Sequence, residues 1–221
     1  MHPLIFIPKV RNIKKVVSSW DHLPYDVLVV ENIREVEAYH FARNYFLLRK
    51  EYTHLVICPD DLIIDHDAFE SLKRNVEEYG LSNLSGIANR QQDFPDEYCT
   101  QDITKVDYNY VNGASTPYYN KEDIPSEIFS AGFTGFCCQW ISRELMSKVT
   151  FNGSSSHNNC LDWQFAREVY ALNIPLLVSP TSLFRHLSLE QRQDLRQWKL
   201  GNQTRESLVY MLDANRGDDC K

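Results

Sequence analysis

The segment that decides the fold is residues 53–64, which read THLVICPDDLII. Its apolar part, residues 54–58, has the length and composition of a strand that is buried on both faces. Pro59 ends this strand because proline has no amide hydrogen to donate to a sheet. Asp60 and Asp61 follow directly, so two carboxylates stand at the carboxyl end of a buried strand.

Strand-like and helix-like segments alternate on both sides of this stretch. Apolar and β-branched runs predict further strands at residues 4–8 and 26–30, and apolar stripes predict helices at residues 13–20, 38–48 and 67–80. The stripe of the second helix consists of Ala38, Phe41, Ala42, Tyr45 and Leu48. The third helix is expected to start at a capping-box-like Asp67 and to end at Gly80. Such alternation favours a mostly parallel sheet with helices on its faces.

Acidic residues lie at the edge of this sheet where a ligand is expected. In open α/β sheets, ligands bind beyond the carboxyl ends of the strands, which here carry Pro8, Glu31, Asp60 and Asp61. Adjacent carboxylates repel each other unless a cation compensates them. Hard oxygen ligands suit Mg²⁺ or Mn²⁺ that is bound together with phosphates. The alternative is a turn followed by a helix cap, since aspartate is common in both.

The second half of the chain offers two further polar candidates. Residues 87–130 lack a sustained period and predict short strands and long loops, after which a helix opens at Ser142. Asp162 stands at the start of another predicted helix, where an aspartate is either a cap or a catalytic base. His186 follows a strand predicted at residues 176–179 and a turn. It is either an ordinary hydrogen-bonded histidine or a metal ligand.

Composition excludes several classes of protein. The 221 residues carry a formal net charge of −7, and an acidic surface repels nucleic-acid phosphates, so we expect no nucleic-acid partner. No apolar run is long enough to span a membrane, and residues 1–8 do not resemble a signal peptide, so a cytoplasmic protein is expected. The six cysteines form no CxxC pair, which indicates free thiols in a reducing compartment.

Five segments, taken in order, resemble the family 2-like GT-A glycosyltransferases. Residues 53–64 and 67–69 resemble the DXD region of these enzymes. The other segments resemble the helix before it, the acceptor-side strand and helix, the "ED" segment and the His-containing end of the catalytic core. These four segments are residues 42–44, 132–144, 161–165 and 184–187. Order and approximate spacing agree over residues 3–187.

The resemblance implies a GT-A-like, Rossmann-type α/β fold. A mostly parallel sheet would be flanked by helices, with a small mixed portion on the acceptor side. A single catalytic domain would span residues 1–187, with the donor-binding half at about 1–90 and the acceptor half at about 131–187. Residues 188–221 would form a C-terminal helical extension.

The resemblance also implies an activity and its catalytic residues. A hexosyltransferase-type enzyme would move a sugar from a nucleotide-diphosphate sugar, with a UDP-sugar as the expected donor, to a hydroxyl of a glycan or another acceptor. Asp61 would bind the Mn²⁺ or Mg²⁺ ion that holds the diphosphate, and His186 would complete the metal or diphosphate site. Asp162 would be the general base that deprotonates the acceptor, with inversion at the anomeric carbon.

Four further residues are assigned to donor binding by the same resemblance. Asp60 would lie near the ribose, and Glu31 matches an acidic position that often contacts the base or the ribose. Pro8 belongs to the donor-binding edge at the end of the first strand. Arg43 is either a contact to the diphosphate or a residue of the helix surface.

Two departures from the family pattern keep other classes open. Pro59 stands at the first Asp of DXD, and Leu161 stands at the Glu of the "ED" pair. A degenerate GT-A fold that binds a sugar or a partner protein without turnover is therefore the main alternative. A sugar-1-phosphate nucleotidyltransferase would need a glycine-rich loop, and residues 7–12 contain no glycine. A glycoside hydrolase fits poorly, because its two carboxylates face one bond whereas Asp60 and Asp61 are adjacent.

Overall fold

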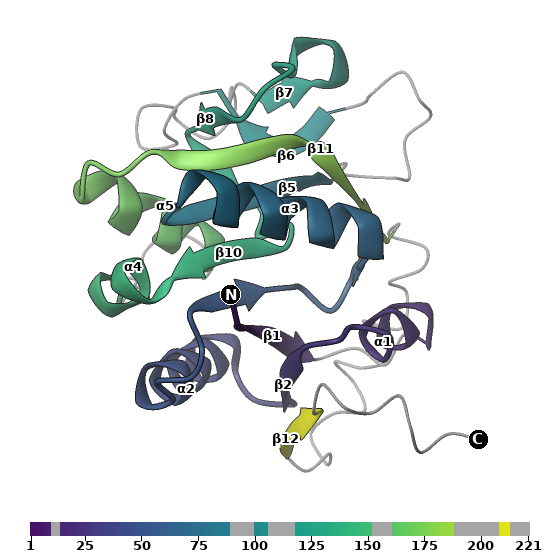
Figure 1. The fold of residues 1–221 in the computed structure, drawn as a ribbon, viewed down its shortest axis with the longest axis vertical. Helices are drawn as coiled ribbons and strands as arrows, with labels where there is room; N and C mark the ends of the chain where they lie inside the picture. The colour runs from purple at the N-terminus through teal and green to yellow at the C-terminus, as the bar shows by residue number, and fades with distance from the viewer. Residues whose placement is uncertain (10–13, 89–99, 106–117, 152–160, 188–207, 213–221) are drawn as a thin grey trace.

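The described residues build a large mixed sheet with helices on both faces (Figure 1). This computed structural model describes residues 1–9, 14–88, 100–105, 118–151, 161–187 and 208–212. The main sheet has nine strands, and a second sheet contains three strands in the order β7-β6-β9. The predicted α/β class, with a large and mostly parallel central sheet flanked by helices, is confirmed.

The bounds of the elements are as follows. The main sheet contains β1 (Pro3–Lys9), β2 (Asp26–Glu31), β3 (His54–Ile57), β4 (Leu62–Ile63), β5 (Asn83–Ala88), β8 (Phe129–Ala131), β10 (Gln139–Ser142), β11 (Leu176–His186) and β12 (Leu208–Leu212). The small sheet contains β6 (Thr100–Thr104), β7 (Tyr118–Asn120) and β9 (Phe133–Thr134). The helices are α1 (Lys14–Trp20), α2 (Glu35–Leu48), α3 (His66–Tyr79), α4 (Arg143–Lys148), α5 (Leu161–Ala171) and the 3₁₀ helix η3 (Lys121–Asp123). None of the described helices combines the length and the apolar character that crossing a membrane requires.

Five strands of the main sheet run in the same direction. The strand order is β12-β2-β1-β3-β10-β5-β11-β4, and β8 pairs with β11 off this path. β1 is parallel to β2 and β3, and β5 is parallel to β11, while β10 is inserted antiparallel between β3 and β5. The carboxyl ends of β1, β2, β3, β5 and β11 therefore lie at the same edge of the sheet.

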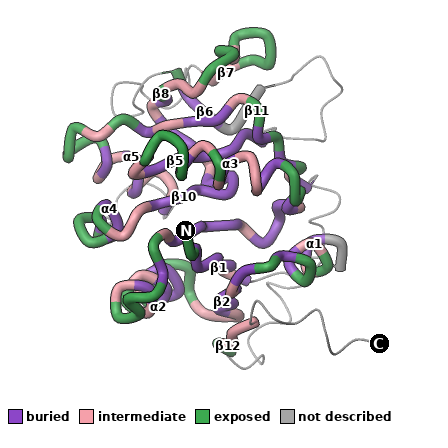
Figure 2. The backbone as a smooth tube through the Cα atoms, in the orientation of Figure 1, coloured by how far each residue is buried: buried purple, intermediate pink, exposed green. Residues whose placement is uncertain are grey.

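Alternating side chains along the strands supply a core to each face of the sheet. In β1, Leu4 and Phe6 pack with the apolar faces of α2, α4 and α5, whereas Ile5 and Ile7 pack with those of α1 and α3. All four side chains are fully buried, as expected of a strand covered on both faces. Figure 2 shows the buried strands in the middle of the molecule. Helices on both faces are thus anchored to strands that lead to one edge.

The ends of two helices test the predicted caps. Ser142 accepts a hydrogen bond from the backbone N–H of Leu145 at 3.2 Å and starts α4, as predicted. The cap predicted for α3 at Asp67 is wrong, because Asp65 is the N-cap and accepts from the N–H of Ala68 at 2.9 Å. The Asp67 side chain is fully exposed. Gly80 ends α3 in the left-handed conformation, with φ 59°.

The buried face of α2 differs from the predicted stripe. The predicted members Phe41 and Leu48 are 40% and 81% exposed. The residues that α2 buries are Ala38, Tyr39, Ala42 and Phe46. Apolar side chains lie on more than one face of this helix, so spacing alone did not identify the face that meets the sheet. As a result, the predicted stripe omits Tyr39, which lines the pocket described below.

The C-terminal end of α2 is held by an arginine from α4. The Arg143 guanidinium donates to the carbonyl oxygens of Phe46, Leu47 and Tyr52 at 2.9–3.2 Å. The last carbonyls of a helix have no partner within the helix, and a cation is favourable at that end of the helix dipole. Arg143 therefore sets the position of α2, whose other end reaches the pocket described below.

Two strands in the second half depart from prediction. β11 continues to His186 through residues 180–182, which were predicted as a turn, and the irregular stretch is taken up by a register shift between Val178 and Leu183. The predicted helical extension is wrong at residues 208–212, which form β12 and pair antiparallel with β2. Pairing satisfies the backbone groups along the edge of β2. The rest of the predicted extension lies outside the described residues.

We predict that Gly86→Ala destabilises the protein. Gly86 lies in β5, where an added Cβ would stand 2.6 Å from Cδ2 of Phe184 and 2.8 Å from the Ser182 carbonyl oxygen in β11. The backbone oxygen cannot move aside alone, so the free energy of unfolding measured in urea should fall by about 2–3 kcal/mol. The control is Gly80→Ala, whose Cβ meets nothing within 4 Å and which should lose only about 1 kcal/mol through its left-handed φ. Equal losses would contradict this account of the β5–β11 contact.

Candidate functional site

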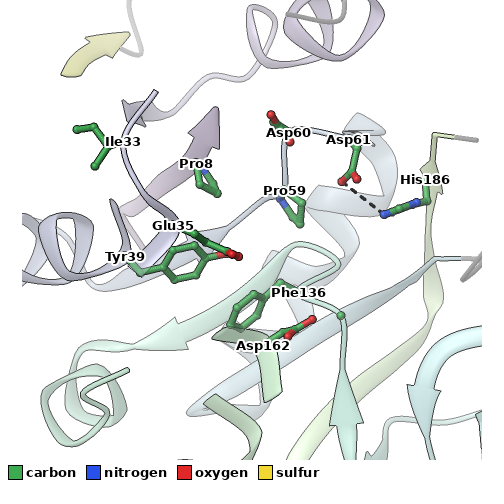
Figure 3. Close-up of a pocket in the computed structure, with 11 residues that line it drawn as sticks. Pro8, Ile33, Glu35, Tyr39, Pro59, Asp60, Asp61, Phe136, Asp162 and His186 are labelled. Atoms are coloured by element: carbon green, nitrogen blue, oxygen red, sulfur yellow. Dashed lines mark ion pairs between the residues drawn. The ribbon is translucent and has the colours of Figure 1, made fainter. Parts of the chain in front are cut away.

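A pocket of about 290 Å³ opens at the sheet edge where the parallel strands end (Figure 3). Pro8 of β1, the segment after β2, the segment after β3 and the last residue of β11 all contribute to its wall. The lining residues are Pro8, Ile33, Glu35, Tyr39, Pro59, Asp60, Asp61, Gly135, Phe136, Asp162 and His186. Five of the seven residues predicted from the sequence are therefore brought together in one pocket. They are Pro8, Asp60, Asp61, Asp162 and His186.

The two adjacent aspartates are buried at the end of β3. Asp60 is 3% exposed and Asp61 is 5% exposed. The N–H of Cys58 donates to the carbonyl oxygen of Phe6 in β1 at 3.0 Å, and the N–H of Leu62 donates to that of Pro59 at 3.2 Å. The first bond continues the β1–β3 pairing and the second closes a turn around the aspartates. Both carboxylates are thus carried by a constrained backbone.

His186 is held against Asp61 by strand pairing. β11 pairs antiparallel with β4, with His186 opposite Leu62, and the N–H of Leu187 donates to the carbonyl oxygen of Asp61 at 2.9 Å. Nε2 of His186 lies 3.4 Å from Oδ1 of Asp61, and the two side chains are 16% and 8% exposed. Figure 3 shows this ion pair on the pocket wall. The structure therefore joins the two residues that the sequence assigned to one metal or diphosphate site.

Asp162 lies on the opposite wall of the pocket from Asp60 and Asp61 (Figure 3). It belongs to the first turn of α5, where its Oδ1 accepts a hydrogen bond from the N–H of Trp163 at 2.8 Å. The Trp163 ring stacks on Phe133 with the ring centroids 3.5 Å apart. Asp162 is the second residue of α5 and its side chain bonds the N–H of the next residue, so it is not the N-cap of this helix. Its carboxylate faces the pocket.

Tyr39, Glu35 and Phe136 are pocket residues that sequence reasoning missed. The Tyr39 ring packs edge-on against Phe6 and stacks on Phe136, with centroid distances of 5.1 and 5.7 Å. Burial raises the pKa of Tyr39 well above its ordinary value, and the negative charges of Glu35, Asp162, Asp60 and Asp61 raise it further. Its hydroxyl therefore stays protonated near neutral pH. Glu35 and Tyr39 are four residues apart on α2, a spacing that would have placed both on one face.

Glu31 does not line the pocket. Its Oε2 accepts a hydrogen bond from Nζ of Lys9 at 3.0 Å, and Lys9 is only 8% exposed. Burial works to lower the pKa of Lys9, but the hydrogen bond to Glu31 and the neighbouring Tyr210 leave that pKa raised. Lys9 and Glu31 thus form a partly buried ion pair between the ends of β1 and β2, next to β12.

Arg43 also lies away from the pocket. Its Nε donates to the carbonyl oxygen of Val149 at 2.6 Å, and its second guanidinium nitrogen donates to that of Ser147 at 3.2 Å. These carbonyls belong to the C-terminal end of α4 and the residue that follows it. Arg43 therefore joins α2 to α4.

The charge of the pocket limits how a metal ion would be bound. Glu35, Asp60, Asp61 and Asp162 supply four carboxylates, and the lining residues include His186 but no lysine or arginine. Among the described residues, no group of three His, Cys, Asp or Glu side chains has the geometry to hold a metal ion. Mg²⁺ commonly uses one or two carboxylates and completes its shell with water and substrate phosphates. Asp61 and His186 alone would leave most of the coordination shell of such an ion to water and phosphate oxygens.

Comparison with known proteins bears on the fold. No family model and no curated protein matches this chain. Among solved structures, A197 from STIV is 15% identical with a TM-score of 0.52, and the match covers 85% of this chain and 82% of A197. The chain therefore shares the α/β fold of A197. TarS 1–349 of S. aureus is 11% identical with a TM-score of 0.49, and the match covers 90% and 65% of the two chains. The apo form of a UDP-glucose pyrophosphorylase is 11% identical with a TM-score of 0.42, covering 80% and 64%.

We predict that Arg43→Ala lowers stability. Removing the guanidinium leaves the Ser147 and Val149 carbonyls without their charged donor, which should lower the free energy of unfolding by about 1–3 kcal/mol in urea. Arg34→Ala is the control, because the Arg34 side chain is 86% exposed and its loss should cost less than about 0.5 kcal/mol. If Arg43→Ala were as stable as the parent, the assignment of Arg43 to the α2–α4 contact would be wrong.

Proposed function

We propose that this chain is a metal-dependent glycosyltransferase that moves a sugar from a nucleotide-diphosphate sugar to a hydroxyl acceptor, with inversion. The observation that carries the proposal is the shared pocket of Asp60, Asp61, Asp162 and His186. These residues come from three distant parts of the sequence and meet at the carboxyl edge of the strands, where α/β proteins bind ligands.

The donor is assigned to the wall formed by the ends of β1 and β3. Asp61 and His186 would hold a divalent cation, with Asp60 towards the ribose and Pro8 beside the nucleoside. A bound divalent cation supplies charge neutralisation to a diphosphate leaving group. That contribution suits this pocket, because its lining otherwise presents carboxylates to an anionic ligand. Glu31, which lies outside the pocket in its ion pair with Lys9, would contact the base or the ribose of the donor.

Asp162 is assigned as the general base on the opposite wall. Its carboxylate would take the proton of the acceptor hydroxyl as the oxygen attacks the anomeric carbon. The new C–O bond forms as the bond from the anomeric carbon to the diphosphate oxygen breaks. The nucleoside diphosphate leaves with the bonding electron pair. Attack from the face opposite the leaving group inverts the anomeric configuration.

The division of labour along the chain follows from these assignments. Residues 1–90 contribute Pro8, Asp60 and Asp61, and residues 131–187 contribute Phe136 and Asp162. We therefore propose a donor-binding half and an acceptor half within one catalytic unit. His186 belongs to the second half and returns to the donor wall through the pairing of β11 with β4.

A binding protein without turnover is the second candidate. Two observations favour it: Pro59 stands at the first position of the DXD motif, and Leu161 stands at the Glu of the "ED" pair. The glycosyltransferase and the binding protein would share the donor site, but only the glycosyltransferase would use Asp162 as a general base. Binding and turnover must therefore be measured separately.

Binding is tested by thermal unfolding with a panel of nucleotide diphosphates and their sugars, with and without Mn²⁺. A ligand at a hundred times its dissociation constant adds about 2.7 kcal/mol, which should raise Tm by roughly 5–10 °C in a domain of this size. We expect the shift with UDP-sugars to need Mn²⁺ and to disappear in Asp61→Ala. Asp67→Ala is the control, because its side chain is fully exposed on α3. The absence of a shift with every nucleotide would overturn the nucleotide-sugar proposal.

Turnover is tested by release of UDP from UDP-sugars, with water or added glycans as acceptors. Asp162→Asn keeps the shape of the side chain but removes the base, so the rate should fall about 10²–10⁴-fold while the Mn²⁺-dependent Tm shift remains. An unchanged rate would exclude Asp162 as the base. A parent protein that shows the Tm shift but releases no UDP would favour the binding candidate.

A further inference from the structure

Two buried cysteines lie in contact beside the candidate site. Sγ of Cys58 is 3.4 Å from Sγ of Cys138, and both residues are 0% exposed. Neither residue is in a disulfide, and the neighbouring Cys137, which is also buried, is not in one either. The proposed sugar transfer uses none of these thiols.

The pairing of β3 with β10 explains the sulfur contact. The two strands are antiparallel, and their last paired residues at this end are Gln139 and Ile57. Cys138 precedes Gln139 and Cys58 follows Ile57, so both cysteines lie just beyond the same end of the ladder. The 3.4 Å between the sulfurs compares with about 2.05 Å in a disulfide, so a small movement of the side chains would bring them to bonding distance.

Each of these two cysteines lies next to a segment that lines the pocket. Cys58 directly precedes Pro59, Asp60 and Asp61, and Cys138 follows Phe136 by two residues. Cys138 has a positive φ of 52°, a conformation that non-glycine residues adopt rarely and only where the surroundings hold it. A bond between the sulfurs would tie the aspartate segment to this constrained segment.

We propose that Cys58 and Cys138 are a reversible disulfide site that responds to hydrogen peroxide. One thiolate attacks the peroxide, the O–O bond breaks, and a sulfenic acid forms with release of hydroxide. The second thiol attacks the sulfenic sulfur, which forms the S–S bond and releases water. In sum, two thiols and one hydrogen peroxide give one disulfide and two waters. A dithiol reverses the reaction by thiol–disulfide exchange when local unfolding exposes the buried pair.

Burial of the two cysteines limits which oxidants can reach them. Because both cysteines are fully buried, a molecule as small as peroxide is favoured over bulky disulfides or alkylating reagents. Burial also raises the pKa of the Cys138 thiol well above its ordinary value, so the pair reacts slowly. Contact between the sulfurs, rather than high reactivity, is what favours the cross-link. A sulfenic acid at either position meets its partner before a second peroxide arrives.

The test is peroxide treatment of the folded full chain, followed by denaturation, alkylation of the remaining thiols and peptide mapping without reduction. We expect a peptide that links Cys58 to Cys138 and that disappears after treatment with dithiothreitol. The cross-link should raise Tm by on the order of 10 °C, because it closes a long loop. The mapping requires no nucleotide or sugar, so its outcome is independent of the proposed glycosyltransferase function.

Variants separate this pair from the other thiols. Cys137→Ala removes an adjacent buried thiol and should retain both the linked peptide and the Tm rise, whereas Cys58→Ala and Cys138→Ala should lose both. Cys137→Ala and the parent decide the question even if the other two variants fold poorly. The proposal is overturned if Cys58 and Cys138 stay alkylatable after peroxide. It is also overturned if they become separate sulfinic acids, or if Cys58 is found linked to any cysteine other than Cys138.

Discussion

The antiparallel pairing of β4 with β11 is the contact on which the candidate site depends. β4 has only two residues, yet its register sets His186 opposite Leu62 and brings the backbone of Leu187 to that of Asp61. The end of the long strand β11 is thereby hydrogen-bonded to the segment that follows β3. His186 reaches Asp61 through this contact, and the pocket acquires a wall from the second half of the chain.

Negative charge concentrated at one sheet edge is the second constraint. Four carboxylates line the pocket, and two of them belong to adjacent, buried residues. Their charges act together with burial on Tyr39, whose pKa is raised well above its ordinary value. Such a pocket repels a bare anion and favours a cation, or an anion that is bound with a cation. The chemistry proposed for the site follows from this balance of charge.

The predictions that succeeded depended on local patterns. Short apolar runs that end in polar residues predicted β1, β2 and β3. The alternation of these runs with helical patterns predicted the parallel sheet. Local patterns did not identify which face of a helix is buried or which distant residues are in contact. α2 carries apolar residues on more than one face, so Tyr39 was overlooked. Arg43 contacts the carbonyls of Ser147 and Val149, which are distant in sequence.

Local sequence patterns were enough to predict the α/β class and the polar residues at the ends of its strands. Hydrophobic periodicity and the chemistry of proline and aspartate act over a few neighbouring residues, so they can be recognised in the sequence itself. The folded chain alone decides that Asp61 meets His186, that Asp162 faces both aspartates, and that Cys58 touches Cys138. Each of these contacts follows from strand register or helix packing between distant segments, and no local pattern encodes that geometry.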